Sequence, residues 1–278
     1  MIDMKINWPD GSRVAVMLTF DFDAETLWTG RDPENARRPG ILSQGRYGAL
    51  VGVPKILETL KDAGVPATFF VVGWTADNHP VPTEMILREG HEIAHHSYSH
   101  RWIDPAFPDQ EVEEMERGLE SLKRIGIVPK GYRSPAGETS DNLMRLLHKH
   151  GFLYDSSLQD HINPYRAKLP DGSPGPVELP WHWSLDDAVY ALFSIKSPRP
   201  IFPNSHIRQV FQDEFREIYR WGGLYNLVMH PQVSGRPSRI ALLREMIAFI
   251  QTFPGVWFAN GTQVAEAWAA AHETPTQK

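Results

Sequence analysis

Hydrophobic and polar positions follow two alternating patterns along the chain. Short runs of apolar or β-branched residues, typical of buried strands, are separated by longer segments in which apolar residues recur every three or four positions, as in half-buried helices. Ile56, Leu57 and Leu60 form one such stripe, and Gly64 ends it. The expected strands are Val14–Phe20, Ala67–Val72, Glu92–His95, Gly131–Arg133, Leu153–Ser156, Val177–Pro180, Leu224–Met229 and Gly255–Phe258, and the expected helices are Val53–Ala63, Pro82–Glu89, Asp109–Arg124, Ser140–His150, Ser205–Trp221, Ser238–Thr252 and Thr262–His272.

About eight strands with intervening helices predict a single domain, residues 1–278, built as a distorted (β/α) barrel of about seven or eight units. An open doubly wound sheet is the alternative fold. No Gly-x-Gly-x-x-Gly or Walker pattern opens a helix, so nucleotide binding has no local support. Residues 24–46 and 158–203 break the alternation, and long irregular loops on a barrel are more often functional rims than linkers.

Charge and composition narrow the classes of partner. The formal charge of −6 argues against nucleic acid and anionic membranes, because both bind clustered positive charge. The chain has no cysteine, so any metal must be held by histidine and carboxylate side chains. Residues 1–9 lack the features of a secretory signal, and no stretch approaches the roughly 20 apolar residues of a membrane span. We therefore expect a cytoplasmic protein, and the sequence leaves open whether it forms a homo-oligomer.

Four of the twelve histidines lie between positions 91 and 100, which is the densest chemical signal in the chain. His96 and His100 are four residues apart. One turn of helix, or a helical loop after the strand, would place both imidazoles on one side, as a divalent metal requires. The same spacing is more often found in surface or core packing. His91 and His95 are expected to be structural.

The first strand supplies the carboxylates that such a site lacks. Asp21 and Asp23 follow the apolar run 14–18, and two acids at the end of a buried strand are costly unless they are paired or coordinated. A helix cap or a loop ion pair would also account for either acid. Two histidines, one aspartate and a water form an open metal set of the catalytic type, because structural sites are usually closed by four protein ligands.

Two further elements come directly after expected strands. Arg133 precedes Pro135 and Gly137 in a stiff, turning loop, where its guanidinium could hold a carboxylate through a bidentate hydrogen bond. His230 ends the apolar run 227–229, although a single histidine there is more often a core residue. All four elements fall at the C-terminal ends of expected parallel strands, which is where a (β/α) barrel assembles its active site.

Together these residues resemble the motifs of the polysaccharide deacetylase (NodB-homology) family. The resemblance extends over about residues 12–268, and the matching elements are Thr19–Asp23, His96–His100, Arg133-x-Pro135-x-Gly137 and Leu227–His230. It implies a distorted (β/α) barrel. It also implies a divalent metal, usually zinc, held by Asp23, His96 and His100.

The resemblance implies three further roles: Asp21 as general base, His230 as general acid and Arg133 as the residue that orients the base. The family usually has two adjacent acids, whereas Asp21 and Asp23 of this chain are separated by one residue. This arrangement resembles that of a branch acting on peptidoglycan or on small amides. The fourth family motif matches only in part at residues 155–157. The carboxylate that partners the acid is therefore open among three candidates, Asp155, Asp160 and Asp186.

The residues and the resemblance agree on a metal-dependent hydrolase of carbon–nitrogen bonds in non-peptide amides. The first expectation is N-deacetylation of an N-acetylated sugar or a peptidoglycan-type substrate, in which Asp21 accepts a proton from the metal-bound water and His230 protonates the leaving nitrogen. A backbone N–H of the Arg133 loop is expected to stabilise the oxyanion. Aromatic side chains that can stack on a substrate ring lie on nearby loops: Trp28, Trp102, Tyr132, Tyr165, Trp181 and Trp183.

Three alternatives differ in class. Because an extracellular polymer fits poorly with the absence of a signal, hydrolysis of a cyclic imide or ureide, as in imidase-like and allantoinase-like relatives, is the first alternative. A carbohydrate-binding protein without catalysis is the second, although none of the motif residues is damaged. A metal-dependent phosphoesterase, which commonly needs ligands for two metals, is the third.

Overall fold

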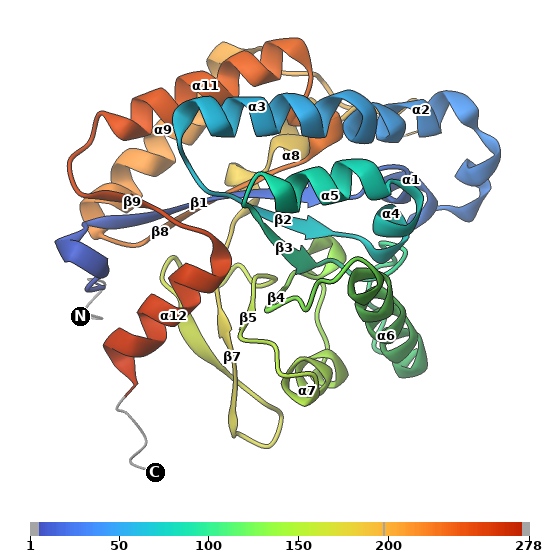
Figure 1. Cartoon of the computed structure of the whole chain (residues 1–278), viewed down its shortest axis with the longest axis horizontal. Helices are drawn as coiled ribbons and strands as arrows, with labels where there is room; N and C mark the ends of the chain where they lie inside the picture. Colours follow the sequence, from blue (N-terminus) through green and yellow to red (C-terminus); the bar gives the residue numbers. More distant parts are fainter. Residues whose placement is uncertain (1–5, 197, 274–278) are drawn as a thin grey trace.

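The computed structural model describes residues 6–196 and 198–273, which are built around one curved, nine-stranded sheet (Figure 1). Its strands are β1 (Val14–Phe22), β2 (Thr68–Val71), β3 (Glu92–His95), β4 (Gly131–Tyr132), β5 (Tyr154–Asp155), β6 (Tyr165–Lys168), β7 (Pro174–Glu178), β8 (Leu224–Met229) and β9 (Val256–Phe258). Across the sheet the order is β6-β7-β5-β4-β3-β2-β1-β8, and β9 pairs with the first part of β1. All pairs are parallel except the β6–β7 hairpin.

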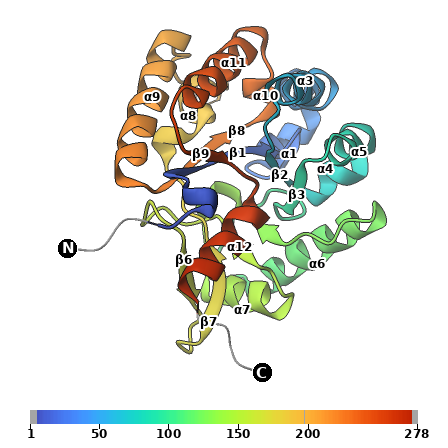
Figure 2. The same ribbon diagram turned by 60° about the vertical axis from the view of Figure 1, so that its left-hand side comes forward.

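Helices follow most strands and surround the sheet, as Figure 2 shows. They are α1 (Thr26–Thr29), α2 (Pro39–Tyr47), α3 (Val53–Ala63), α4 (Gly73–Asn78), α5 (Pro80–Arg88), α6 (Pro108–Arg124), α7 (Asp141–Lys149), α8 (Asp187–Ala191), α9 (Asn204–Trp221), α10 (Pro231–Ser234), α11 (Pro237–Gln251) and α12 (Gly261–His272). The expected distorted (β/α) barrel is confirmed, although β4 and β5 have only two residues each.

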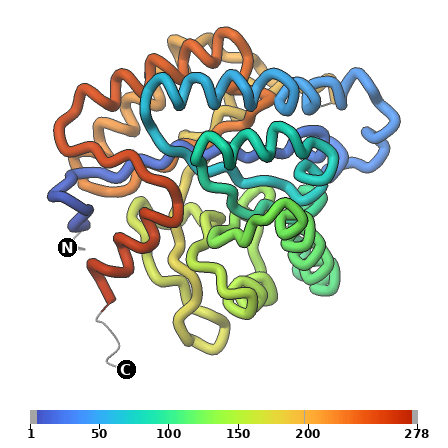
Figure 3. The backbone as a smooth tube through the Cα atoms, in the orientation of Figure 1, coloured from blue at the N-terminus to red at the C-terminus, as the bar shows by residue number. Residues whose placement is uncertain are grey.

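The last helix, α12, covers the end of the barrel where the strands begin. Gly261 N–H donates to Thr68 Oγ1 (2.8 Å) at the start of β2, and Trp268 packs with Ala15 and Met17 of β1. Figure 3 shows the first described residues beside this helix. The opposite end, where the parallel strands finish, is the one on which a barrel carries its site.

Successive residues of β1 point to opposite faces of the sheet. The even-numbered residues 14–22 pack against the outer helices, whereas Ala15 and Met17 pack inside the barrel. All nine residues are buried, because both faces of this parallel strand are covered. The inward series continues two residues at a time to Asp21 at the end of the strand.

The sheet does not close through a full ladder. A single bridge between Asp186 and Val228 links the segment after β7 to β8. The interior is filled by buried side chains from six strands and by α12, so the alternative of an open doubly wound sheet with helices on both faces is wrong.

The expectation of irregular structure over residues 24–46 and 158–203 is wrong in part. Helices α1 and α2 occupy most of the first segment, and the hairpin β6–β7 and α8 lie in the second. Glycines in and after α2 serve close packing: a Cβ on Gly45 would lie 2.5 Å from the backbone of Ala24, and one on Gly52 would lie 2.2 Å from the Pro231 carbonyl oxygen. Glycine weakens a helix on average, but here a side chain would not fit.

Candidate active site

Two aspartates lie at the C-terminal end of β1, on its interior side. Asp21 is in the strand and Asp23 follows it by two residues, so the alternation of the strand directs both inward. Asp23 is completely buried and Asp21 is 6 % exposed. The hydroxyls of Thr26 (2.6 Å) and Thr75 (2.9 Å) donate to the carbonyl oxygen of Asp23 and hold the turn that follows β1.

His96 and His100 come from the loop after β3. The helical turn expected between them is wrong, because Ser97 and His100 have left-handed backbones with φ of 63° and 60°. A carboxylate of α6 holds this loop: Glu114 accepts hydrogen bonds from Ser99 N–H (2.7 Å) at Oε2 and from Ser99 Oγ (2.6 Å) at Oε1. The loop reverses direction and so brings both imidazoles to one side without a helix.

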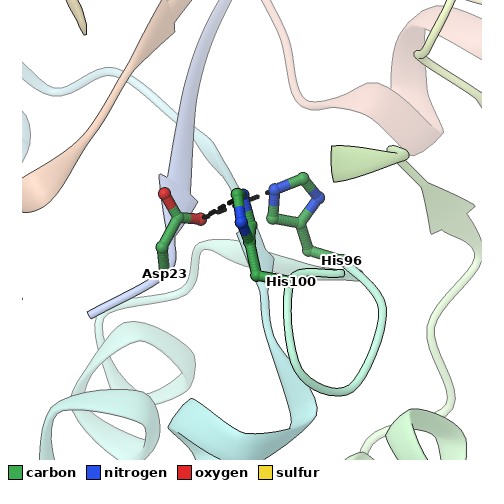
Figure 4. Close-up of side chains that lie close together, drawn as sticks. All are labelled: Asp23, His96 and His100. Atoms are coloured by element: carbon green, nitrogen blue, oxygen red, sulfur yellow. Dashed lines mark ion pairs between the residues drawn. The ribbon is translucent and has the colours of Figure 1, made fainter. Parts of the chain in front are cut away.

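Both imidazoles face Asp23, as Figure 4 shows. Asp23 Oδ1 lies 3.5 Å from His96 Nε2 and 3.6 Å from His100 Nε2. Ligand atoms about 2.1 Å from a tetrahedral ion are roughly 3.4 Å apart, so these separations suit one shared cation. His96 Nδ1 lies 2.6 Å from the Arg133 carbonyl oxygen, which requires the ring proton at Nδ1 and leaves a lone pair at Nε2.

The electrostatics of this cluster also fit a cation. Asp23 Oδ1 is buried and has no hydrogen-bond partner among the described residues. Burial raises the pKa of Asp23 to about 8, and the neighbouring Asp21 carboxylate adds to the effect. Burial holds the pKa values of His96 and His100 below their ordinary range, so both rings are neutral at pH 7. Two neutral imidazoles and one unpartnered carboxylate oxygen form a donor set that fits a divalent cation.

Arg133 lies in the barrel interior and holds Asp21. Its Nη1 donates to Asp21 Oδ1 (2.8 Å) and to Thr19 Oγ1 (3.0 Å), while Nε donates to the Ser156 carbonyl oxygen (3.0 Å). The guanidinium lies 4.0 Å from the centre of the Phe70 ring. The expected bidentate contact is thus a single hydrogen bond, because the other N–H groups bond the barrel itself. Burial alone would raise the pKa of Asp21, but the charges of Arg133, His96 and His230, with the hydrogen bond from Arg133, together outweigh burial and hold this pKa below its usual value.

His230 follows β8, and its ring lies beside the cation cluster. Its Nδ1 donates to Asp187 Oδ1 (2.7 Å), its backbone N–H donates to Asp187 Oδ2 (3.0 Å), and its Nε2 lies 3.9 Å from Asp23 Oδ2. Burial would lower the pKa of His230, but the carboxylates of Asp186 and Asp187 outweigh burial and hold the pKa well above its ordinary value. The ring is therefore protonated, with its Nε2–H in the site.

Asp187 is the residue that sequence reasoning missed. None of the three candidates bonds the ring of His230: Asp186 Oδ1 lies 3.9 Å from Nδ1, while Asp155 and Asp160 bond other residues. Asp186 instead caps α8 by accepting a hydrogen bond from the backbone N–H two residues on (2.7 Å). The sequence does indicate this role, because Asp186 and Asp187 are adjacent acids at the start of a helix. When the first of two such acids caps the helix, the second is free to bond another residue, here His230.

A cavity of about 430 Å³ lies over these groups. Its floor includes the residues expected to serve as base, acid, base-orienting residue and metal ligands, namely Asp21, His230, Arg133, His96 and His100. Trp102, Trp181 and Trp183 contribute to its walls. The rings of Trp181 and Trp183 meet edge to face with centroids 4.6 Å apart, and Trp102 and Trp183 are nearly half exposed.

Three other aromatic residues expected near the substrate lie elsewhere, so we do not retain them as binding residues. Tyr132 packs between α6 and α7, because its neighbour Arg133 points inward and the strand alternation turns Tyr132 outward. Trp28 is buried and lines a different cavity. Tyr165 lies on the edge strand β6 and donates its hydroxyl to Asp160.

Comparison with known proteins identifies the family. Residues 47–154 match the family model for polysaccharide deacetylase. The whole chain resembles a crystal structure from Mycobacterium smegmatis that is classed as a polysaccharide deacetylase, with 41 % identity, a TM-score of 0.91 and coverage of 98 % of this chain and 95 % of that one. The chain belongs to the polysaccharide deacetylase family.

One further relative and one protein of the same fold are similar to this deacetylase family member over most of its length. The peptidoglycan deacetylase of Helicobacter pylori is 29 % identical over 91 % of this chain and 95 % of that protein. The crystal structure of an allantoinase shares the fold, with a TM-score of 0.83, 23 % identity and coverage of 96 % of this chain and 94 % of that one. Within residues 6–196 and 198–273 of this deacetylase family member, no helix has the length and apolar character needed to cross a membrane.

Proposed function

We propose that this protein removes the acetyl group from an N-acetylated sugar of a peptidoglycan-type glycan and that it uses a divalent cation, most simply zinc. The observation that carries the proposal is the gathering of an acid, a base and a cation cluster beneath one cavity. Amide hydrolysis requires a base for the attacking water, an acid for the leaving nitrogen and stabilisation of the oxyanion. The side chains under the cavity suit each of these tasks.

Asp23, His96 and His100 would hold the cation. A bound divalent cation supplies Lewis-acid chemistry, since it lowers the pKa of a water towards about 7 and polarises a carbonyl oxygen. Three protein ligands leave a position free, as in catalytic zinc sites. The Arg133 carbonyl oxygen fixes the tautomer and the orientation of the His96 ring.

Asp21 accepts the proton of the attacking water. Arg133 holds its Oδ1, and its Oδ2 lies 3.8 Å from His96 Nε2, towards the cation cluster. The lowered pKa keeps this carboxylate ionised at neutral pH, which a base requires. Because Arg133 is itself fixed by the barrel interior, Asp21 cannot turn away from the cavity without losing that hydrogen bond.

His230 donates its Nε2 proton to the leaving nitrogen, because an amine anion would otherwise have to depart. Asp187 holds the ring through Nδ1 and stabilises its charged form. The second oxygen of Asp187 accepts the Ser234 hydroxyl and the His230 backbone N–H, so this carboxylate is itself fixed.

The backbone N–H of Ala136 is the donor that we assign to the oxyanion. In the loop after β4, Ser134 N–H donates to Ser157 Oγ, Gly137 N–H donates to the Ser134 carbonyl oxygen, and Pro135 has no N–H. Ala136 lines the cavity and has a left-handed backbone, with φ of 59°. Of the described residues 134–137, it therefore supplies the N–H available to a substrate carbonyl.

The walls of the cavity suit a sugar. Indole faces stack on sugar rings, and Trp102 and Trp183 are exposed enough to do so. The Helicobacter pylori relative is named a peptidoglycan deacetylase and aligns over nearly its whole length, which supports a peptidoglycan-type substrate.

A hydrolysis panel tests the proposal. N-acetylglucosamine oligomers, peptidoglycan fragments and cyclic imides are offered to the protein after chelation and again after zinc is restored. Acetate release from a glycan that requires zinc supports deacetylation. Opening of the imide without acetate release would replace it by cyclic imide or ureide hydrolysis, and no hydrolysis by the zinc-loaded protein would contradict amide chemistry at this site.

One variant tests the roles of the two aspartates. Asp21→Asn should lose turnover and keep its zinc, because Asp21 serves as the base and Asp23 as the ligand. Loss of zinc from Asp21→Asn, measured by elemental analysis, would mean that the two roles are exchanged. Asp23→Ala is the matched comparison and should lose zinc and activity together.

A further inference from the structure

Two arginines outside the proposed catalytic groups line the same cavity. Arg31 lies two residues after the end of α1 and Arg199 precedes α9, and both are exposed at the rim. Within the described part of the chain, neither side chain forms an ion pair or a hydrogen bond. We call Arg31 and Arg199 the rim arginines.

Neighbouring contacts hold the rim arginines close together. The guanidinium of Arg31 lies 5.4 Å from the ring centre of Trp102 in the cavity wall. Asp32, the next residue, forms an ion pair with Lys196, which stands three positions before Arg199. This pair joins the two segments, which are 164 positions apart in the chain. Arg31 and Arg199 are near enough for their charges to repel.

The other charges of the cavity do not neutralise the rim arginines. Asp23 and Asp186 attract Arg31, but Asp23 belongs to the cation cluster and Asp186 faces His230. Asp21 is paired with Arg133. Among the described lining residues this leaves one acid at the rim, Glu138, against two guanidinium groups. Two neighbouring guanidinium groups that form no ion pair repel each other, and an anionic ligand between them reduces that cost. The net charge of −6 means that the chain as a whole repels anions. The local positive charge of the rim arginines is therefore the feature that would attract an anion to this cavity.

We propose that the rim arginines bind a carboxylate that the substrate carries outside its scissile amide and that they thereby select anionic substrates. The inference rests on the proposed amide hydrolysis in the same cavity. A guanidinium matches the two oxygens of a carboxylate, and Trp102 provides an apolar face beside it. On a glycan, the preferred unit is then an N-acetylated sugar with an acidic substituent rather than a neutral sugar.

Matched substrate pairs measure this selection. One pair is an N-acetylated disaccharide with an ether-linked carboxylate and the same disaccharide with a carboxamide. A second pair is a cyclic imide with a carboxylate or a carboxamide substituent. For the zinc-loaded wild type we expect kcat/KM to be about tenfold or more higher for the carboxylate member, mainly through KM, and we expect salt to shrink this ratio.

Variants assign the selection to the rim arginines. Arg31→Gln and Arg199→Gln should each lower the carboxylate-to-carboxamide ratio several-fold, and the double variant should bring it close to one. Arg220→Gln removes an exposed arginine on α9, outside the cavity lining, and should leave the ratio at the wild-type value. A melting curve for each variant shows that the fold is retained.

A binding measurement separates this inference from the proposed reaction. The zinc-loaded Asp21→Asn protein is titrated calorimetrically with both members of each pair, so that no turnover is required. Tighter binding of the carboxylate members, lost when the rim arginines are replaced, supports the inference even if neither pair is hydrolysed by the wild type. Equal affinity for both members, or a preference that survives the double variant, overturns it, even if the deacetylation itself is observed.

Discussion

The strongest prediction concerns Asp187, which bonds the proposed acid. Replacing it by Asn removes the charge but keeps an oxygen that can accept the hydrogen bond from His230 Nδ1. A hydrogen bond to a charged group contributes about 1.5–3 kcal/mol, and 1.36 kcal/mol corresponds to a tenfold change in proton affinity. Most of this stabilisation disappears in Asp187→Asn, so the pKa of His230 should fall by about 1 to 2.

The direction of the pH shift follows from the proposed role of His230 as the acid. The neighbouring carboxylates hold its pKa above the ordinary value, so the protonated acid is present at low pH and is lost as the pH rises through that pKa. In Asp187→Asn the loss occurs at lower pH. The alkaline limb of kcat/KM should therefore move down by about 1 to 2 pH units, while the acidic limb, set by Asp21, stays in place.

The assay is a profile of kcat/KM from about pH 5 to about pH 10 with the best substrate of the panel. Asp186→Asn is the matched control: this carboxylate lies 3.9 Å from Nδ1 without bonding it, so its replacement should shift the limb less. An unmoved limb in Asp187→Asn, or a larger shift in Asp186→Asn, would refute the assignment of the pair.

Three further outcomes are expected. Since burial raises the pKa of Asp23 to about 8, the affinity for zinc measured by calorimetry should rise about tenfold per pH unit up to that pH and level off above it; a flat profile would contradict Asp23 as a ligand. Glu114→Ala should lower zinc affinity about 10- to 100-fold, because it frees the histidine loop, whereas the exposed neighbour in Glu113→Ala should have no effect. Gly131→Ala places a Cβ 1.8 Å from the tyrosine ring of β5 and should cost about 1–3 kcal/mol in thermal unfolding, whereas Gly40→Ala, with nothing within 4 Å, should cost far less.

Regular patterns in the sequence are sufficient to predict the barrel and the inward direction of Asp21 and Asp23 in the site. The period of two in β1 is shared by its apolar and its acidic residues, so the strand that predicts the core also predicts that Asp21 and Asp23 point the same way. The same rule, applied to β4, would have excluded Tyr132 from the substrate site, because Arg133 points inward.

Other features depend on contacts that are distant in the chain. The loop that carries His96 and His100 takes its shape from Glu114 on the next helix, and nothing in the spacing of the histidines reveals that partner. Glycine normally weakens a helix, and the sequence alone gives no reason for Gly52 between α2 and α3. The structure gives the reason, because the backbone of Pro231 approaches Gly52 too closely for a side chain. Tertiary contacts override local propensity at both places.

The position of Arg133 has a consequence for heat inactivation. Inside the barrel, the guanidinium is tied to three strands or strand ends, through Asp21 and Thr19 on β1, Ser156 after β5 and Asn226 on β8. The histidine loop is instead held from outside the barrel, by Glu114 of α6 and by the backbone N–H groups of Gly73 and Trp74 in α4. Loops held by peripheral helices open before the strands of a core do. On warming, the zinc-loaded protein should first release zinc and only later lose the geometry around Asp21, so that inactivation well below the melting temperature is reversed by cooling in the presence of zinc.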